Sequence, residues 1–454
     1  MPSKDQVTLL PDYHGADGVP RGLPKTVDTW LLGRGHRVTA KRVDRSRARL
    51  RKVVQRAVSH GSWKWPKRPV FFFGDPHADA QAFIGSLIAT GGVIKSGPAV
   101  DDIALNRVGR RALFVIGGDC LDKGPSNLRL LRAIRRLIDT GARVKLIAGN
   151  HDVRLLMGLR ALSEDADART EHFFVRMGPK VVPLLLEVGK EYLDGRHALR
   201  DIPSARECRR RLFPSAAWFD DFAVLAAQSL PDVAVRRELA RMQNKTETLE
   251  HAWKDAGLSV RQVYAIACKC RDLFLCPDGE FAWFFRDMQL LHRDGSFLFV
   301  HAGIDDSLVR LIDKRGIGHL NRTFREQLKN DLFGFYYGPL GNAMRTKYRD
   351  FDRPLSKDGV KHAYRLGLYA VVHGHRNRSY GQRIMLRRGM IHFECDTTMD
   401  RNSRKKKGMR GFGSGVTIVQ PAGRVLGISN DYPSAKSFVP SDYLQDMAKG
   451  RHAA

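Results

Sequence analysis

The chain has 454 residues, and its 43% of hydrophobic residues suffices for the core of one large domain or of two domains. Lys and Arg number 77 against 48 Asp and Glu, which gives a net charge of +29. This excess favours polyanionic partners such as nucleic acid, nucleotides or phosphoproteins, although a solvated basic surface would give the same balance. Residues 1–11 have no apolar core of signal-peptide length, and no run reaches the roughly 20 apolar residues of a membrane span. With six cysteines, few for this length, a cytoplasmic protein without a membrane span is expected.

Residues 1–68 precede the first long apolar run and are expected to form a basic N-terminal extension. Their first part is rich in Pro and Gly, which predicts irregular, extended chain. Residues 34–56 then hold ten Lys or Arg and one acidic residue. A weak apolar stripe within them predicts a helix, and its members are Leu50, Val53, Val54 and Ala57. Such a helix would either face a polyanion or pack on the rest of the protein through its stripe.

The rest of the chain divides by its periodicity. Residues 69–154 alternate apolar runs with helical stretches, as βαβ units do. Residues 155–290 have few strand signals and predict a helical insertion, a cap beside the functional site. Strand signals return in residues 291–433, and residues 434–454 are a polar tail that is expected to be mobile. The predicted fold class is α/β, with two packed mixed sheets flanked by helices and interrupted by the helical insertion.

Five apolar runs share one feature, because residue types that bind metals follow each of them. The runs are 71–73, 113–116, 145–148, 297–300 and 371–372, and the residues that follow them are Asp75, His77, Asp119, Asn150, His301 and His375. A buried strand reads as a continuous apolar run, and ligands of open α/β sheets bind beyond the carboxyl ends of the strands. These six side chains are therefore expected to converge at one edge of a sheet. They make up the ligand set of a two-metal site, which clamps the attacking and leaving oxygens of a phosphoryl displacement.

Each predicted ligand can be given a role. Asp75 and His77, two residues apart, would hold one cation. Asp119 would bridge both cations through its carboxylate. The second cation would be held by Asn150, His301 and His375. Mixed carboxylate, imidazole and carbonyl ligation favours two divalent cations of manganese, iron or zinc.

Two further residues are predicted to be catalytic. His151 lies beside a predicted ligand but is a different residue, so it can act as general acid toward the leaving oxygen. Asp122 is the natural partner to orient the imidazole of His151 and to support its protonated form.

The order and spacing of these residues resemble the calcineurin-like metallophosphoesterase superfamily. Its motifs are G-D-x-H, G-D-x-x-D-R-G, G-N-H-[DE], a V-H-A-G-like histidine and G-H. The matching segments here are 74–77, 118–124, 149–152, 300–303 and 374–375. By this resemblance, residues 69–154 and 291–433 would be the two halves of one metallophosphoesterase domain. The resemblance implies hydrolysis of phosphoric esters by direct attack of metal-bound hydroxide, without a phosphoenzyme intermediate.

Two branches of the superfamily remain open. Asp122 and the unpaired histidine motif resemble the phosphoprotein phosphatases, whereas residues 149–156 and 124–125 are more similar to bacterial symmetrical diadenosine tetraphosphate hydrolases. Nucleases of the superfamily usually end G-H-x-H, and Asn377 replaces that last histidine here. The leading prediction is hydrolysis of phosphomonoesters, including phosphoserine or phosphothreonine in proteins. The alternatives are hydrolysis of dinucleoside polyphosphates or other nucleotides, and nucleic-acid binding on a phosphatase scaffold.

Phosphate binding is where the sequence departs from the family. Lys123 replaces the phosphate-binding Arg of the second motif, and lysine keeps the charge but loses the planar bidentate fork. The resemblance also implies phosphate contact by Asn150. Through a loose alignment it places Arg345 as a second phosphate-binding arginine, with Arg349 as a rival.

Three segments near the last motif complete the predictions. His373 is expected to form a hydrogen bond within the sheet, and residues 396–398 to form a loop that shapes the site. By the resemblance to phosphoprotein phosphatases, the basic residues 401–410 would form a flexible loop beside the cleft, which would attract anionic substrates. A solvated loop unrelated to catalysis would have the same composition.

Overall fold

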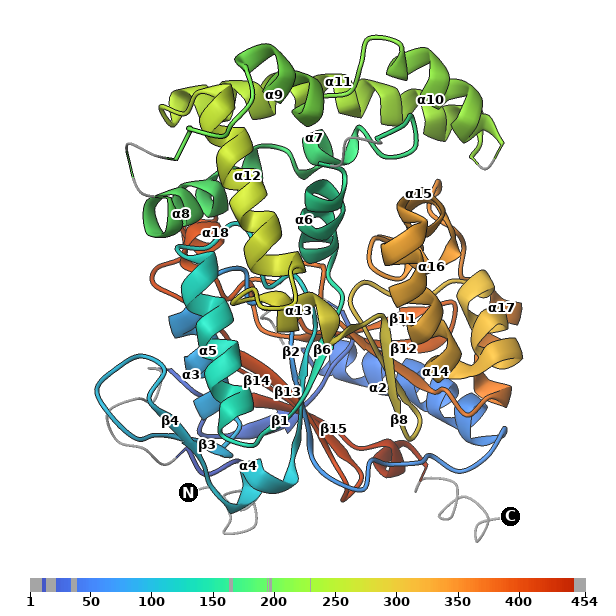
Figure 1. Cartoon of the computed structure of the whole chain (residues 1–454). Coiled ribbons are helices and arrows are strands. Elements are labelled where there is room, and N and C mark those ends of the chain that lie inside the picture. Colours follow the sequence, from blue (N-terminus) through green and yellow to red (C-terminus); the bar gives the residue numbers. More distant parts are fainter. Residues whose placement is uncertain are drawn as a thin grey trace, which may run out of the picture.

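The computed structural model describes residues 10–13, 22–33, 39–162, 166–193, 195, 198–228 and 230–444. Within these residues two large β-sheets pack against each other through a shared apolar core (Figure 1). The first sheet, in spatial order, consists of β1 (Val27–Thr29), β15 (Ala435–Phe438), β14 (Arg424–Ser429), β13 (Gly415–Gln420), β2 (Val70–Phe73), β5 (Leu113–Ile116), β6 (Arg143–Ile147) and β7 (Met288–Gln289). The second consists of β11 (Arg383–Arg387), β12 (Met390–Glu394), β10 (Ala370–His373), β9 (Phe297–Val300) and β8 (Leu291–Asp294). A small third sheet pairs β3 (Val93–Lys95) with β4 (Ile103–Leu105).

The apolar strands are buried on both faces. In β2, Phe71 and Phe73 point to the core under the helices, whereas Phe72 points to the core between the two sheets. There the ring of Phe72 meets that of Phe299 from β9, with centroids 6.0 Å apart. Because alternate residues of a strand point to opposite faces, burial on both faces requires the uninterrupted apolar run that the sequence has.

Helices cover the outer faces of both sheets, which confirms the predicted α/β class with two packed mixed sheets. On the side of the first sheet lie α3 (Ala80–Ile88), α4 (Arg107–Arg111) and α5 (Asn127–Asp139) (Figure 1). On the side of the second sheet lie α14 (Asp306–Asn330), α15 (Leu332–Tyr337), α16 (Pro339–Asn342) and α17 (Lys357–Arg365). The sequence of α5 is strongly amphipathic, and the apolar side of this helix is buried.

A group of helices lies at one end of the molecule, above α6 (Asn150–Arg160) (Figure 1). We call it the cap, and it consists of α7 (Phe173–Met177), η1 (Pro179–Val181), α8 (Val182–Tyr192), α9 (Ala205–Leu212), α10 (Trp218–Ala227), α11 (Asp232–Asp255) and α12 (Val260–Leu275). The chain returns to the sheets through α13 (Ala282–Arg286). β7 then joins the first sheet beside β6, inside the range predicted to be the insertion. The sequence of β7 is too short to show a strand period.

Both ends of the described chain belong to the sheet framework. The basic helix α2 (Ala40–Val58) buries Leu50, Val53 and Val54, so it packs on the protein through its apolar stripe. β1 pairs in parallel with β15, so residues predicted to be an irregular extension and a mobile tail form an edge of the first sheet. The sequence does not identify β15 as a strand, because only Ala435 and Phe438 at its ends are buried and its middle residues are polar. The short helix η2 (Pro440–Tyr443) follows it.

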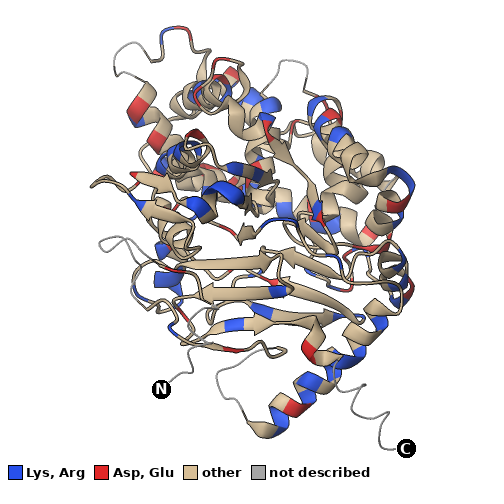
Figure 2. Ribbon diagram, turned by 90° about the horizontal axis from the view of Figure 1, so that it is seen from below, with Lys and Arg blue, Asp and Glu red and all other residues tan. Residues whose placement is uncertain are grey.

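The charge excess is spread over the molecule. In the view of Figure 2, Lys and Arg lie on many helices and loops and do not gather on one face. No helix of the described residues is long and apolar enough to cross a membrane.

Candidate metal centre and active site

The predicted ligands follow strands that are neighbours in the two sheets. β2, β5 and β6 run parallel side by side, and they lead into Asp75, Asp119 and Asn150. In the second sheet, β9 and β10 run parallel side by side and lead into His301 and His375. The strand ends of both sheets therefore deliver these side chains to one place, as the sequence pattern predicts.

The turns that carry the ligands are sharp. Positive φ values, between 43° and 69°, occur at six non-glycine residues of the site, which are Asp75, His77, Asp119, Asp122, Lys123 and His375. This backbone region is unfavourable for residues other than glycine, so the surrounding structure must hold it. Gly149 and Gly374 allow the turns to approach one another, because a Cβ on Gly149 would overlap the backbone nitrogen of Asp119 and one on Gly374 would overlap the carboxylate of Asp75.

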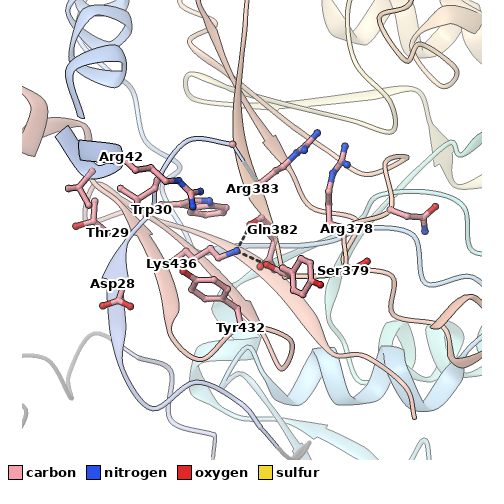
Figure 3. Close-up of a pocket in the computed structure, with 16 residues that line it drawn as sticks. Asp28, Thr29, Trp30, Arg42, Arg378, Ser379, Gln382, Arg383, Tyr432 and Lys436 are labelled. Carbon is pink, nitrogen blue, oxygen red and sulfur yellow. Dashed lines mark hydrogen bonds between the residues drawn. The ribbon is translucent and has the colours of Figure 1, made fainter. Parts of the chain in front are cut away.

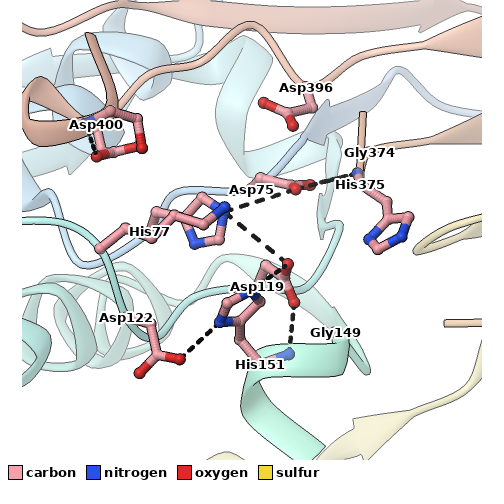
Figure 4. A network of polar contacts seen from close by, with 12 residues as sticks. Asp75, His77, Asp119, Asp122, Gly149, His151, Gly374, His375, Asp396 and Asp400 are labelled. Carbon is pink, nitrogen blue, oxygen red and sulfur yellow. Dashed lines mark hydrogen bonds and ion pairs between the residues drawn. The ribbon is translucent and has the colours of Figure 1, made fainter. Parts of the chain in front are cut away.

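Two groups of three possible ligands share one carboxylate. Asp75, His77 and Asp119 offer ligand atoms within 4.8 Å of one another, and so do Asp119, His301 and His375. Asn150 joins the second group, since its amide lies 3.4 Å from Nε2 of His301. The structure thus brings all six predicted ligands together, with Asp119 shared by the two groups. Figure 4 shows Asp75, His77, Asp119 and His375 of this set.

The histidine rings present a nitrogen to the interior of the site. Nδ1 of His77 lies 3.1 Å from the carbonyl oxygen of Leu121, and Nδ1 of His301 lies 2.8 Å from that of Gly117. Hydrogen bonds from Nδ1 to carbonyl groups fix the tautomer whose Nε2 can bind a metal. Nε2 of His375 is buried and has no hydrogen-bond partner in the described structure. This orphaned atom, together with the shared carboxylate, fits a pair of divalent cations.

The side chain of Asn150 lies beside Arg154, which is not among the site residues predicted from the sequence. One end of the Asn150 amide lies 2.8 Å from Nδ1 of His375, and the other end lies 2.6 Å from Nη2 of Arg154. Arg154 lies four residues after Asn150 in α6, so the two side chains share one face of that helix. This spacing could have identified Arg154 from the sequence.

His151 is placed as a proton donor would be and not as a ligand. Its Nδ1 lies 2.6 Å from a carboxylate oxygen of Asp122, and its Nε2 lies 3.8 Å from the carboxylate of Asp119. Its backbone nitrogen donates to Asp119 at 2.8 Å. Nε2, the free end of the ring, therefore faces the centre while Asp122 holds the other end (Figure 4).

Burial dominates the electrostatics of the site. It raises the pKa of Asp75 well above its ordinary value, and the neighbouring carboxylates of Asp396 and Asp119 raise it further. Burial raises the pKa of Asp122 to about 7 and lowers the pKa of His151 well below its ordinary value. Burial alone would raise the pKa of Asp119, but the nearby histidines outweigh this effect and bring the pKa well below its ordinary value. Bound cations would neutralise this crowding of buried carboxylates.

Cationic side chains surround the centre. Lys123 points into it, and its ammonium group contacts Nε2 of His77. Partial burial lowers the pKa of Lys180 from η1 of the cap, and the positive charges of Lys123 and Arg154 lower it further, so these three groups are neighbours. Partial burial also lowers the pKa of Lys347, which is near Lys123 as well. Among the described residues, Arg154, Lys180 and Lys347 form no ion pair with a carboxylate. Such unpaired cations suit an anionic substrate.

The predicted second phosphate-binding arginine lies farther out. The guanidinium of Arg345 packs over the ring of Tyr336, 4.3 Å from its centroid, and Nε donates to the carbonyl oxygen of Gly341. Its rival Arg349 pairs with Asp352 and packs on Phe351. No contact joins either arginine to a predicted ligand in the described structure, so the role given to Arg345 stays a prediction.

The segments after the last ligand behave in different ways. His373 is buried, and its Nδ1 lies 3.0 Å from the carbonyl oxygen of Gly374, away from the metal groups. Asp396 is buried beside Asp75, as expected of a loop that shapes the site (Figure 4). The basic segment was predicted to be a flexible loop, but residues Arg401–Lys406 form the helix α18. Two of its cations are held in place, because Arg401 pairs with Asp79 and Arg404 with Asp431.

Comparison with known proteins agrees with this geometry. Residues 68–224 match the family model of calcineurin-like phosphoesterases. The matched segment contains the first three ligand turns, and the fold adds His301 and His375 from beyond it. No curated protein matches the chain.

Solved structures of phosphatases show a distant likeness. A cold-active protein tyrosine phosphatase has 13% identity and a TM-score of 0.41, with 82% of this chain and 78% of that chain covered. A cold-active protein-tyrosine phosphatase of a psychrophilic Shewanella species has 12% identity and a TM-score of 0.38, with 82% and 80% covered. A protein serine/threonine phosphatase from Saccharomyces cerevisiae has 13% identity and a TM-score of 0.35, with 86% and 89% covered.

Proposed function

We propose that this protein is a two-metal phosphoesterase that hydrolyses phosphomonoesters, with a mechanism like that of the phosphoprotein phosphatases. The observation that carries the proposal is the pair of ligand groups that share Asp119, with His151 and Asp122 directly beside them. Two divalent cations bound there would supply charge that makes a water molecule more acidic and neutralises the phosphoryl oxygens. Manganese, iron and zinc all suit this mixture of ligands.

The chain's own groups would then perform three tasks. Lys123 and Arg154 would hold the phosphoryl oxygens and offset the charge that develops on them. His151 would give a proton from Nε2 to the leaving oxygen, since its other nitrogen is engaged by Asp122. The carboxylate of Asp122 would keep the ring in the productive orientation and stabilise its protonated form. Asn150 would connect Arg154 to the ligand His375.

A second substrate class is favoured by a specific observation. Lys180 from the cap and Lys347 from the segment after α16 form no ion pair with a carboxylate among the described residues, and both lie outside the predicted ligands. A substrate with several phosphates, such as a dinucleoside polyphosphate, would meet these charges, whereas a single phosphomonoester would not need them. Nucleic-acid binding without turnover is the least favoured alternative, because all six predicted ligands are in place.

Three substrates assayed side by side would test the proposal. Protein reconstituted with manganese should hydrolyse p-nitrophenyl phosphate and should lose this activity in the Asp119→Asn variant. A phosphopeptide and diadenosine tetraphosphate, compared by kcat/KM, would then separate the two substrate classes. Salt-dependent retention on nucleic acid, with no metal-dependent turnover of any of the three substrates, would refute the proposed function.

A further inference from the structure

The cap contacts the rest of the protein next to the turn that carries Asp122 and Lys123. In Figure 1, α8 of the cap lies against the start of α5, the helix that follows this turn. Asp122 and Lys123 have positive φ values of 68° and 69°. Two consecutive non-glycine residues in this conformation are unfavourable, so other groups must hold the turn. The carboxylate of Asp122 reaches His151 from this turn, so the groups that hold it also determine where that carboxylate lies.

One carboxylate of the cap binds the donors at the start of α5. Glu187 of α8 accepts from the backbone nitrogens of Asn127 and Leu128 at 2.9 and 3.1 Å. It also accepts from the hydroxyl group of Ser126 at 2.8 Å. The first nitrogens of a helix have no partner within the helix, and the helix dipole favours a negative charge there. Because hydrogen bonds to an ionised group are stronger than those between neutral groups, Glu187 fixes the cap to the start of α5.

The side chain of Asn127 connects this contact to the turn. Its Nδ2 donates to Oε1 of Glu187 at 2.8 Å, and its Oδ1 accepts from the backbone nitrogen of Asp122 at 2.8 Å. Asn127 is only 1% exposed, so water has little access to either bond. The amide donates at one end and accepts at the other, so a single orientation satisfies both partners. Hydrogen bonds therefore lead from the cap through Asn127 to the backbone of Asp122, whose carboxylate contacts Nδ1 of His151.

We propose that Glu187 and Asn127 are positioning residues for the proton donor. Through these two residues the cap holds the backbone of Asp122 where its carboxylate engages His151. The helical insertion thereby contributes to the geometry of proton donation. This role in catalysis rests on the proposed function, in which His151 gives a proton to the leaving oxygen. Glu187 lies in the insertion, outside the segments from which the active site is predicted.

Kinetics with two leaving groups test this role in the full, manganese-reconstituted chain. Asn127→Ala removes the link to Asp122, and Glu187→Gln keeps the length of the side chain but has one accepting oxygen in place of two. Each should lower kcat for phenyl phosphate by about twofold to tenfold, the effect of one hydrogen bond, and kcat for p-nitrophenyl phosphate by less. In the His151→Asn background, Asn127→Ala should lower kcat by less than about twofold, because the effects of residues that act through one group are not additive.

Hydrogen exchange measures how firmly the turn is held, without any turnover. The amide of Asp122 is bonded to Asn127 and not to Glu187. Its exchange should nevertheless become about twofold to tenfold faster in Glu187→Gln, as it should in Asn127→Ala, because the link passes through Asn127. Absence of turnover in the wild type would count against the proposed function, and the exchange result would still decide whether the cap holds the turn.

Two control variants separate this link from a general loosening of the protein. Glu191→Gln breaks another contact between α8 and α5, the ion pair with Arg132, which does not lead to Asp122. Lys436→Met removes two hydrogen bonds to backbone carbonyl oxygens in a cavity of about 640 Å³, which is lined by residues outside the cap and α5 (Figure 3). Both variants should leave the exchange of the Asp122 amide and the ratio of kcat for the two substrates unchanged.

Several results would overturn the proposal. One is a control variant that changes both measurements as Glu187→Gln does. Another is unchanged exchange of the Asp122 amide in Glu187→Gln, or equal losses of kcat for both leaving groups. A rise in KM alone would mean that the contact serves substrate binding through Lys180, which lies in η1 directly before α8. Finally, the full effect of Asn127→Ala in the His151→Asn background would show that the link does not act through His151.

Discussion

Replacement of His151 by asparagine separates proton donation from metal binding. Asparagine carries an amide nitrogen near the position of Nδ1, so it can keep the hydrogen bond to Asp122 that spans 2.6 Å in the wild type. It has nothing at the position of Nε2, the atom that faces the centre. Because His151 contributes no atom to either ligand group, the metal content should stay nearly unchanged. General acid catalysis contributes about 10²–10⁴-fold, so kcat should fall by about that factor, which corresponds to about 3–5 kcal/mol.

A comparison of two leaving groups tests proton donation by His151 more directly than the fall in kcat for one substrate. A good leaving group such as p-nitrophenolate needs little help from an acid, whereas phenolate needs much more. The loss of kcat in His151→Asn should therefore be larger for phenyl phosphate than for p-nitrophenyl phosphate. Asp122→Asn should show the same trend with a smaller loss, about 10- to 100-fold, because it removes the negative charge that strengthens the hydrogen bond to Nδ1 of His151.

Two results would refute this reasoning. Equal losses for both leaving groups would mean that His151 does not donate the proton. Metal content that falls in step with activity, measured by mass spectrometry of the purified variant, would make His151 a ligand.

Three other predictions concern the metals, an ion cluster and a helix. Asp119→Asn should lose both cations by metal analysis and His77→Asn only one, and addition of manganese should raise the Tm of the wild type but not of Asp119→Asn. Burial would raise the pKa of Glu394, but His373 and four arginines outweigh it and lower the pKa to about 2. Its contribution to stability, about 3 kcal/mol, is then present above its ordinary pKa of 4.5 and is lost as the pH falls toward 2. Urea unfolding at pH 6 and pH 3 should therefore show a drop in stability that is smaller in Glu394→Gln than in the wild type. Leu50→Ala should destabilise the protein by about 2–5 kcal/mol, whereas the exposed neighbour Arg49→Ala should change stability by less than about 0.5 kcal/mol, and no difference between them would mean that α2 does not pack through its stripe.

The convergence of the candidate metal ligands could be predicted from the sequence because its information is local. Each ligand lies at the end of an apolar run, and strand ends of an α/β protein meet at one edge. Arg154 could also be placed from the sequence, because it lies one helical turn after Asn150 in α6. Lys180 could not be placed in this way, because only the tertiary position of the cap brings η1 to the centre. The same limit applies to Glu394, whose arginine partners come from turns and a neighbouring strand.

The strands at the two ends of the described chain could not be predicted from the sequence, for a different reason. β1 is a short edge strand of the first sheet, and it pairs with the short strand β15, over four hundred residues away in sequence. Neither has the alternation or the apolar run that identifies a strand. The resemblance to phosphoprotein phosphatases places a flexible loop at α18, yet this segment is helical and Arg404 is buried against Asp431. Charge pairs between distant segments cannot be read from composition.

The positive φ values of the ligand turns have a consequence for the evolution and engineering of this protein. At each of those positions glycine would relax the backbone, by about 1 kcal/mol or more per residue, and would erase the side chain that the site needs. Selection for thermal stability alone would therefore act directly against the catalytic centre. Libraries screened for a higher Tm should accumulate glycine at Asp75, Asp122 or Lys123 and lose turnover, unless activity is selected at the same time.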